Sequence, residues 1–193
     1  MDPSQLVRPE LAGRTAYGAP QLDVPVRLNT NENSYAVPPV VVSAILDELG
    51  REVSGLNRYP DRDFAALRKA LTAYLERQAG VTLDPEQLWA ANGSNEVLQH
   101  VVQAFGGPGR TALGFTPAYS MHPIIAETHG MRWIDGTRTP RTFDIDAESA
   151  ARQVREHDPH IVFLCSPNNP TGTALDPAVI AAVLDATSRA LVV

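Results

Sequence analysis

The sequence predicts an α/β protein whose mostly parallel sheet is covered by helices on both faces. From residue 63 onward, short apolar runs alternate with helical patterns, an order typical of βαβ units. The run Ile161–Cys165 is continuously apolar, which indicates a strand buried on both faces. The rigid string Ser166-Pro167-Asn168-Asn169-Pro170-Thr171-Gly172 follows it directly. Open α/β sheets bind ligands beyond the carboxyl ends of their strands, so this turn is the first candidate site.

The elements follow from apolar spacing and turn residues taken in chain order. Residues 1–57 are irregular and rich in Pro, Asn and Gly, with one helical stretch at Val40–Leu49. A helix then begins near Phe64 and ends at Gly80, because glycine commonly terminates helices. Further helices are predicted at Asn95–Phe105, Tyr119–His129, Ala147–His157 and Pro177–Ala186. Strands are predicted at Leu88–Ala91, Thr111–Phe115, Met131–Ile134, Ile161–Cys165 and, as a buried strand, at Leu191–Val193.

Composition excludes several classes of protein. The 193 residues are 44% hydrophobic and 20% charged, which is typical of a globular domain. A net charge of −6 and the lack of a basic run argue against nucleic-acid binding. No apolar run approaches membrane-spanning length. The single cysteine, Cys165, excludes a disulfide framework, and the N-terminus lacks a leader pattern; we therefore predict a cytoplasmic protein.

A second candidate site lies between the predicted strand at 88–91 and the following helix. The string Asn92-Gly93-Ser94-Asn95-Glu96 combines a flexible glycine, a hydroxyl donor and the free N–H groups of a helix start. Such groups attract an anion, so a phosphate cradle is one interpretation. An ordinary helix cap is the alternative.

Tyr119 follows the predicted strand at Thr111–Phe115. An aromatic ring at the carboxyl end of a strand can stack on a flat cofactor, although packing against the core is also possible. The five histidines show neither His-Glu-x-x-His spacing nor a Cys/His cluster. The sequence therefore predicts no metal site.

The string 166–172, together with the Gly93-Ser94 loop, resembles the pyridoxal-phosphate (PLP) aminotransferases of fold type I. The resemblance implies a three-layer αβα large domain at 58–193, preceded by an N-terminal arm and small-domain segment at 1–57. It implies that Asn169 bonds the phenolic oxygen of PLP and that Tyr119 covers the ring. The phosphate is then held by Gly93, Ser94 and Asn95. The family also suggests cis peptide bonds before Pro117 and Pro170.

Two further strings resemble histidinol-phosphate aminotransferases. They are Leu28-Asn29-Thr30-Asn31-Glu32-Asn33, with Tyr35 two residues later, and Asn57-Arg58-Tyr59-Pro60. This resemblance implies amino transfer between glutamate and imidazole-acetol phosphate in histidine biosynthesis. It places Asn31, Asn33 and Tyr35 on the substrate side, although Ser34 stands where many relatives carry proline. Tyr59 is expected to reach the PLP phosphate of a partner subunit, which implies a homodimer.

The same resemblance shows what the chain does not contain. Lys69 is the only lysine, and it lies in a surface-patterned helix before the phosphate loop. The Schiff-base lysine and the aspartate beside the pyridine nitrogen are expected beyond Val193, so the chain is interpreted as the truncated N-terminal half of an enzyme. Alone it is predicted to be inactive. Two alternatives remain: another aromatic or phospho-amino-acid aminotransferase or decarboxylase of this group, or a non-catalytic remnant.

Overall fold

The computed structural model describes residues 2–15, 18 and 20–193. The chain forms two compact units. Unit 1 contains Met1–Ala12 and Ala90–Val193, and unit 2 contains Gly13–Trp89. The predicted boundary between the small-domain segment (1–57) and the large domain (58–193) refers to the domains of the whole enzyme. It stays a prediction.

Unit 1 is built on a sheet of four parallel strands in the order β2-β1-β3-β4. In the register, Ala112 of β1 lies opposite Trp133 of β2 and Ile161 of β3. The central position of β1 and β3 explains their uninterrupted apolar sequences, because both faces and both edges of these strands are covered. The strands are β1 (Thr111–Thr116), β2 (Arg132–Thr137), β3 (Ile161–Phe163) and β4 (Leu191–Val192).

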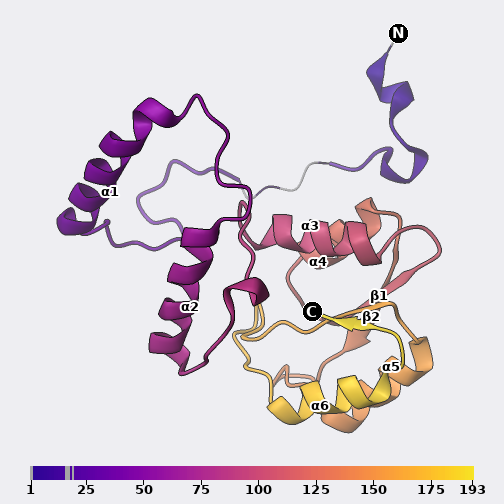
Figure 1. Ribbon diagram of the computed structural model, residues 1–193. Coiled ribbons are helices and arrows are strands. Elements are labelled where there is room, and N and C mark those ends of the chain that lie inside the picture. Colours follow the sequence, from indigo (N-terminus) through magenta and orange to yellow (C-terminus); the bar gives the residue numbers. More distant parts are fainter. Residues whose placement is uncertain (1, 16–17, 19) are drawn as a thin grey trace. The chain divides into compact units, whose positions relative to one another are not determined.

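Two pairs of helices cover the two faces of this sheet (Figure 1). One face carries α3 (Ser94–Phe105) and α4 (Met121–Thr128), and the other carries α5 (Ala147–His157) and α6 (Pro177–Ala186). The result is the predicted three-layer αβα arrangement with a parallel sheet.

The core consists of two apolar clusters, one on each face of the sheet. Alternate residues of β1 divide between them, because successive side chains of a strand point to opposite faces. The cluster facing α5 and α6 contains Leu113, Phe115, Ile134, Ile145, Ala150, Val154, Val162, Val179 and Val183. The cluster facing α3 and α4 contains Val102, Ala112, Ile125, Ala126, Met131, Ile161 and Phe163.

Two aspartates set the starts of α5 and α6. The Asp146 carboxylate accepts a hydrogen bond from the Ser149 backbone N–H over 2.8 Å. The Asp176 carboxylate accepts one from the Ala178 N–H, also over 2.8 Å. Each bond satisfies an N–H group that the helix leaves without an internal partner. Both helices match their predicted bounds for this local reason.

Several predictions about strands and helices were wrong in detail, among them the end of β3, which lies at Phe163 rather than at Cys165. No strand forms at Leu88–Ala91, which follows the 3-10 helix η4 (Pro85–Gln87). No described strand pairs with this segment, so it lacks the ladder of hydrogen bonds that a strand needs. The first turn of the helix predicted at Tyr119 is absent, since α4 begins at Met121. The strand at Leu191–Val192 is half-buried rather than buried, because β4 is the edge strand of the described sheet.

Unit 2 contains two helices and the irregular segments around them. They are α1 (Pro39–Glu52) and α2 (Ala65–Ala79), with the 3-10 helices η3 (Val53–Gly55) and η4 nearby. Gly80 ends α2 with a φ of 66°, which glycine adopts without the steric cost of a side chain. Two short 3-10 helices, η1 (Pro3–Leu6) and η2 (Pro9–Leu11), belong to unit 1.

Arg68 of α2 corrects the prediction that this helix segment lies on the surface. The Arg68 side chain is buried, with 7% of its surface exposed. Its Nε donates to the Pro85 carbonyl over 2.7 Å, and its Nη1 donates to the Asp63 carbonyl over 3.2 Å. An ion pair with Glu86 at 3.0 Å completes the contacts. Arg68 therefore fastens α2 to η4.

Candidate functional site

The candidate site lies at the carboxyl edge of the sheet in unit 1. The loop after β1 and the turn after β3 both leave this edge, and the two strands are neighbours. The peptide bonds before Pro117 and Pro170 are cis, as the resemblance suggested. The bond between Ser166 and Pro167 is also cis, which the resemblance did not suggest.

The start of α3 offers free backbone donors. Gly93 occupies the N-cap position with a φ of 82°, and no side chain caps the helix there. A Cβ atom built on Gly93 meets no heavy atom within 4 Å, so the space beside this backbone is open. The positive end of the helix dipole and the uncapped N–H groups favour a negatively charged group at this position.

Asn95 joins the start of α3 to the loop after β1. Its Nδ2 lies 3.4 Å from the Tyr119 hydroxyl, so two predicted site residues from separate segments are brought together. Its Oδ1 is buried and has no hydrogen-bond partner among the described residues. Exchanging the amide oxygen and nitrogen keeps the Tyr119 contact, with the hydroxyl donating, and places a donor at the unpartnered position. The loop thus fits a bound acceptor such as phosphate.

The ring of Tyr119 is half-buried and rests against His122, a residue of α4 that the sequence analysis did not select. The two rings meet edge to face, with centroids 5.5 Å apart and planes at 89°. His122 in turn stacks on Phe163 of β3. Burial lowers the pKa of His122 below its ordinary value. The Tyr119 ring therefore packs against a buried imidazole whose neutral form is favoured.

The two consecutive asparagines of the turn after β3 differ in exposure. Asn169, the predicted cofactor contact, is exposed, whereas Asn168 is buried with 2% of its surface accessible. The Asn168 Nδ2 donates to the Pro117 carbonyl over 3.0 Å and to the Thr171 hydroxyl over 2.8 Å. Asn168 thus connects the turn of Asn169 to the loop that carries Tyr119.

Arg138, in the loop after β2, is a second buried residue that the sequence analysis missed. Its Nη2 donates to Asn168 Oδ1 over 2.8 Å, and its Nε donates to the Phe115 carbonyl over 2.8 Å. Its Nη1 donates to the Phe143 carbonyl over 3.0 Å. Burial lowers the pKa of Arg138 below the usual value for a guanidinium. No local sequence signal marks this arginine, whereas the doubled asparagine could have indicated two different roles.

The remaining predicted residues lie in unit 2. Asn31, Asn33 and Tyr35 are exposed, and the Asn33 side chain accepts a hydrogen bond from the Tyr35 N–H over 3.0 Å. Tyr59 is fully exposed and lines a surface pocket with its neighbours Asn57 and Arg58. They belong to a different unit from the site residues at the sheet edge.

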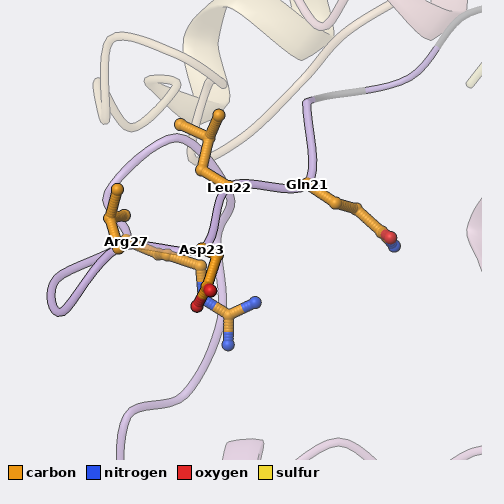
Figure 2. A pocket seen from close by; sticks show the side chains of 5 residues that line it. Gln21, Leu22, Asp23 and Arg27 are labelled. Carbon is orange, nitrogen blue, oxygen red and sulfur yellow. The ribbon is translucent and has the colours of Figure 1, made fainter.

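A second surface pocket of unit 2 contains none of the predicted site residues. It is lined by residues 21–24 and Arg27. Figure 2 shows the Asp23 carboxylate and the Arg27 guanidinium on the same side of this segment, with the Leu22 side chain directed away from them. All five lining residues are exposed. This pocket lacks the convergent buried polar groups that the sheet edge has.

Two kinds of feature are absent from the described part of the chain. No helix there has the length and apolar character needed to cross a membrane. No cluster of three or more His, Cys, Asp or Glu side chains there is arranged to hold a metal ion.

Curated proteins with similar sequences are histidinol-phosphate aminotransferases. The protein of Paenarthrobacter aurescens (strain TC1) is 53% identical over 189 residues, which cover 97% of this chain and 50% of that protein. The protein of Thermobifida fusca (strain YX) is 52% identical over 187 residues, with the same coverage. The chain therefore spans about half the length of the curated relatives it matches.

Solved structures with similar folds are also aminotransferases. N-succinyldiaminopimelate aminotransferase from Mycobacterium tuberculosis matches with a TM-score of 0.66 and 28% identity, over 79% of this chain and 40% of that one. Aspartate aminotransferase from Thermus thermophilus matches in fold with a TM-score of 0.67 and 22% identity, over 82% of this chain and 41% of that one. These neighbours confirm the predicted fold type I. Residues 24–193 match the family described as aminotransferase class I and II, and the chain belongs to that family.

Proposed function

We propose that this chain is part of a PLP-dependent histidinol-phosphate aminotransferase, which exchanges an amino group between glutamate and imidazole-acetol phosphate. Its support from sequence is the set of relatives with that name, which are 47% to 53% identical over almost the whole chain. The observation in the fold that carries the proposal is the contact between Asn95 and Tyr119 beside the uncapped start of α3.

The cofactor fits the residues at this edge of the sheet. Its phosphate group would be held by Gly93, Ser94 and Asn95. There α3 leaves N–H groups free, and Asn95 has a buried amide atom with no partner in the described part of the chain. Tyr119 would cover the ring, and Asn169 would bond its phenolic oxygen. When bound, PLP supplies an electron sink for negative charge that develops on the amino-acid substrate.

In the proposed reaction, the residues of this chain bind the cofactor and orient it. An amide N–H of Asn169 that donates to the phenolic oxygen favours the ionised form of that oxygen, because a hydrogen bond to the charged form stabilises it. The Tyr119 ring would exclude water from one face of the cofactor ring. No catalytic residue is proposed within residues 1–193, since Lys69 is exposed on α2. The lysine and the aspartate used by the family are expected beyond Val193.

The substrate side and the oligomeric state are also proposals. Asn31, Asn33 and Tyr35 would face the substrate, and Tyr59 would reach the cofactor phosphate of a partner subunit in a homodimer. Their exposure supports both roles, because an exposed side chain can contact another molecule. A cytoplasmic location remains a prediction from the sequence.

The proposal is tested with the protein expressed from its own gene, including any residues that the gene encodes beyond Val193. We expect bound PLP, visible by its absorption, and histidinol phosphate as the product of amino transfer. Asn169→Ala should lower the rate at least tenfold, since a hydrogen bond to a charged group contributes about 1.5–3 kcal/mol. Gln103→Ala, which changes an exposed amide of α3, is the matched control and should leave the rate unchanged.

The same assay separates the alternatives. Transfer to aromatic or other phosphorylated substrates, without transfer to imidazole-acetol phosphate, would assign the protein to another aminotransferase of the group. Loss of carbon dioxide from the substrate would indicate a decarboxylase. Bound PLP without turnover of any substrate would identify a non-catalytic remnant, and the absence of bound PLP would contradict the cofactor assignment itself.

A further inference from the structure

We propose that Arg138 is a positioning residue that acts through Asn168 to hold Asn169 and the Tyr119 loop in the geometry that the cofactor requires. This inference rests on the proposed function, because it concerns contacts with PLP. It adds two buried residues to the predicted set, and neither of them is expected to touch the cofactor.

The Arg138 guanidinium connects three segments of unit 1. It donates to the Phe115 carbonyl at the end of β1, to the Phe143 carbonyl in the loop after β2, and to Asn168 Oδ1 in the turn after β3. The guanidinium is planar, so its donors keep fixed directions. One buried side chain therefore fixes the positions of these three segments relative to one another.

Arg138 also determines which way the Asn168 amide faces. A guanidinium has donors only, so the amide oxygen must face Arg138 and the amide nitrogen must face the opposite side. There the nitrogen donates to the Pro117 carbonyl and the Thr171 hydroxyl. The orientation of Asn168 thereby ties the turn to the residue two positions before Tyr119.

The backbone of Asn168 closes the turn around Asn169. The Asn168 N–H donates to the Thr173 carbonyl over 2.8 Å, and the Gly172 N–H donates to the Asn168 carbonyl over 2.7 Å. Asn169 is exposed and has no hydrogen bond of its own side chain among those described. Its direction is therefore set by the turn, and the turn is anchored through Asn168 to Arg138.

The test measures the pH midpoint of the absorption change of bound PLP in the protein expressed from its own gene. The donated hydrogen bond of Asn169 should lower this midpoint by favouring the ionised phenolic oxygen. Asn169→Ala should therefore raise it, by about one pH unit, equivalent to about 1.4 kcal/mol. Arg138→Met, which keeps the side-chain bulk but removes the donors, should raise it by a similar amount.

The double variant Asn169→Ala/Arg138→Met separates a positioning role from general destabilisation. If Arg138 acts through Asn169, the double variant should show the midpoint of Asn169→Ala alone. The matched control is Arg132→Met, which removes an exposed arginine of β2 and should leave the midpoint unchanged. A normal midpoint in folded Arg138→Met, or two shifts that add in the double variant, would overturn the inference.

Two milder variants cover the case in which Arg138→Met does not fold. Arg138→Lys keeps the charge but cannot reach three acceptors at once, and Thr171→Val removes one acceptor of the Asn168 amide with little change in shape. Each should raise the midpoint by less than Asn169→Ala, and an unchanged midpoint in both would overturn the inference. If the wild-type protein binds no PLP, or if Asn169→Ala leaves the midpoint unchanged, the failure lies in the proposed function, and this inference falls with it.

Discussion

The imidazole ring of His122 stacks on the ring of Phe163, with centroids 4.9 Å apart and planes at 19°. The His122 ring also contacts the Tyr119 ring edge to face, so the stack is part of the aromatic packing that supports Tyr119. Burial lowers the pKa of His122 from its ordinary value of 6.5, so the folded state favours the neutral ring. The unfolded state therefore binds more protons at pH values between the lowered pKa and 6.5.

This difference predicts a pH dependence of stability. The contribution of neutral His122 is fully present above about pH 6.5, and it is lost as the pH falls toward the lowered pKa. The free energy of unfolding should therefore fall between pH 7 and pH 5, and His122→Phe should reduce that fall while keeping an aromatic ring in the stack. Urea denaturation at pH 5, 6 and 7 measures both. The control is His100→Gln, at an exposed position of α3, which should show the same fall in the free energy of unfolding as the wild type. A fall in His122→Phe as large as that of the wild type would contradict the prediction.

Gly114, in the centre of β1, leaves room for the indole of Trp133. A Cβ atom on Gly114 would lie 2.3 Å and 2.6 Å from two carbons of that ring. The ring cannot swing freely, because its Nε1 donates to Asp135 over 2.8 Å and its face packs near Phe163. Gly114→Ala should therefore lower the free energy of unfolding by about 1–3 kcal/mol.

Urea denaturation followed by circular dichroism tests this expectation. The matched control is Gly50→Ala in α1, where a Cβ atom meets nothing within 4 Å. There the substitution should be neutral or stabilising by up to about 1 kcal/mol, because alanine favours a helix more than glycine does. Equal stability of Gly114→Ala and the wild type would show that Trp133 can move aside.

Arg68 and Lys69 are adjacent cations of α2 with opposite burial, and they form a natural pair of variants. Arg68→Met leaves the Pro85 and Asp63 carbonyls without their partner, which should cost about 1–3 kcal/mol of local stability. Lys69→Met changes an exposed side chain and should alter stability by less than about 0.5 kcal/mol. Native-state hydrogen exchange of the α2 amides reports the local free energy, and equal exchange in the two variants would disprove the structural role of Arg68.

Asn95 should be more important for the cofactor than for the fold. Its Oδ1 is buried and has no partner among the residues that the structure describes, and such a group costs free energy in the unliganded protein. Asn95→Ala should therefore change the melting temperature of the unliganded protein little, while it weakens PLP binding about tenfold, the equivalent of one hydrogen bond. Thermal melts with and without PLP measure both effects. A large loss of stability without PLP would instead indicate a structural role.

Much of the fold followed from local patterns. The apolar run at Ile161–Cys165 predicted the buried parallel strand β3, and the caps Asp146 and Asp176 lie where α5 and α6 begin. The failures occurred where distant segments decide the outcome. Leu88–Ala91 has the composition of a strand but no described partner. Arg68, which lies in the helix predicted as surface-patterned, is buried against η4.

The sequence by itself determined the strand-turn-helix order and the turn chemistry of residues 166–172, because both depend on neighbours within a few positions. It also predicted the Gly93-Ser94-Asn95 helix start, whose φ and free N–H groups are local properties. Only the tertiary structure distinguished the role of Asn168 from that of Asn169. The two have the same side chain, but Asn168 meets Arg138, 30 positions away in the sequence. Burial and hydrogen bonding at that separation are set by how the loops of neighbouring strands pack, which no local pattern encodes.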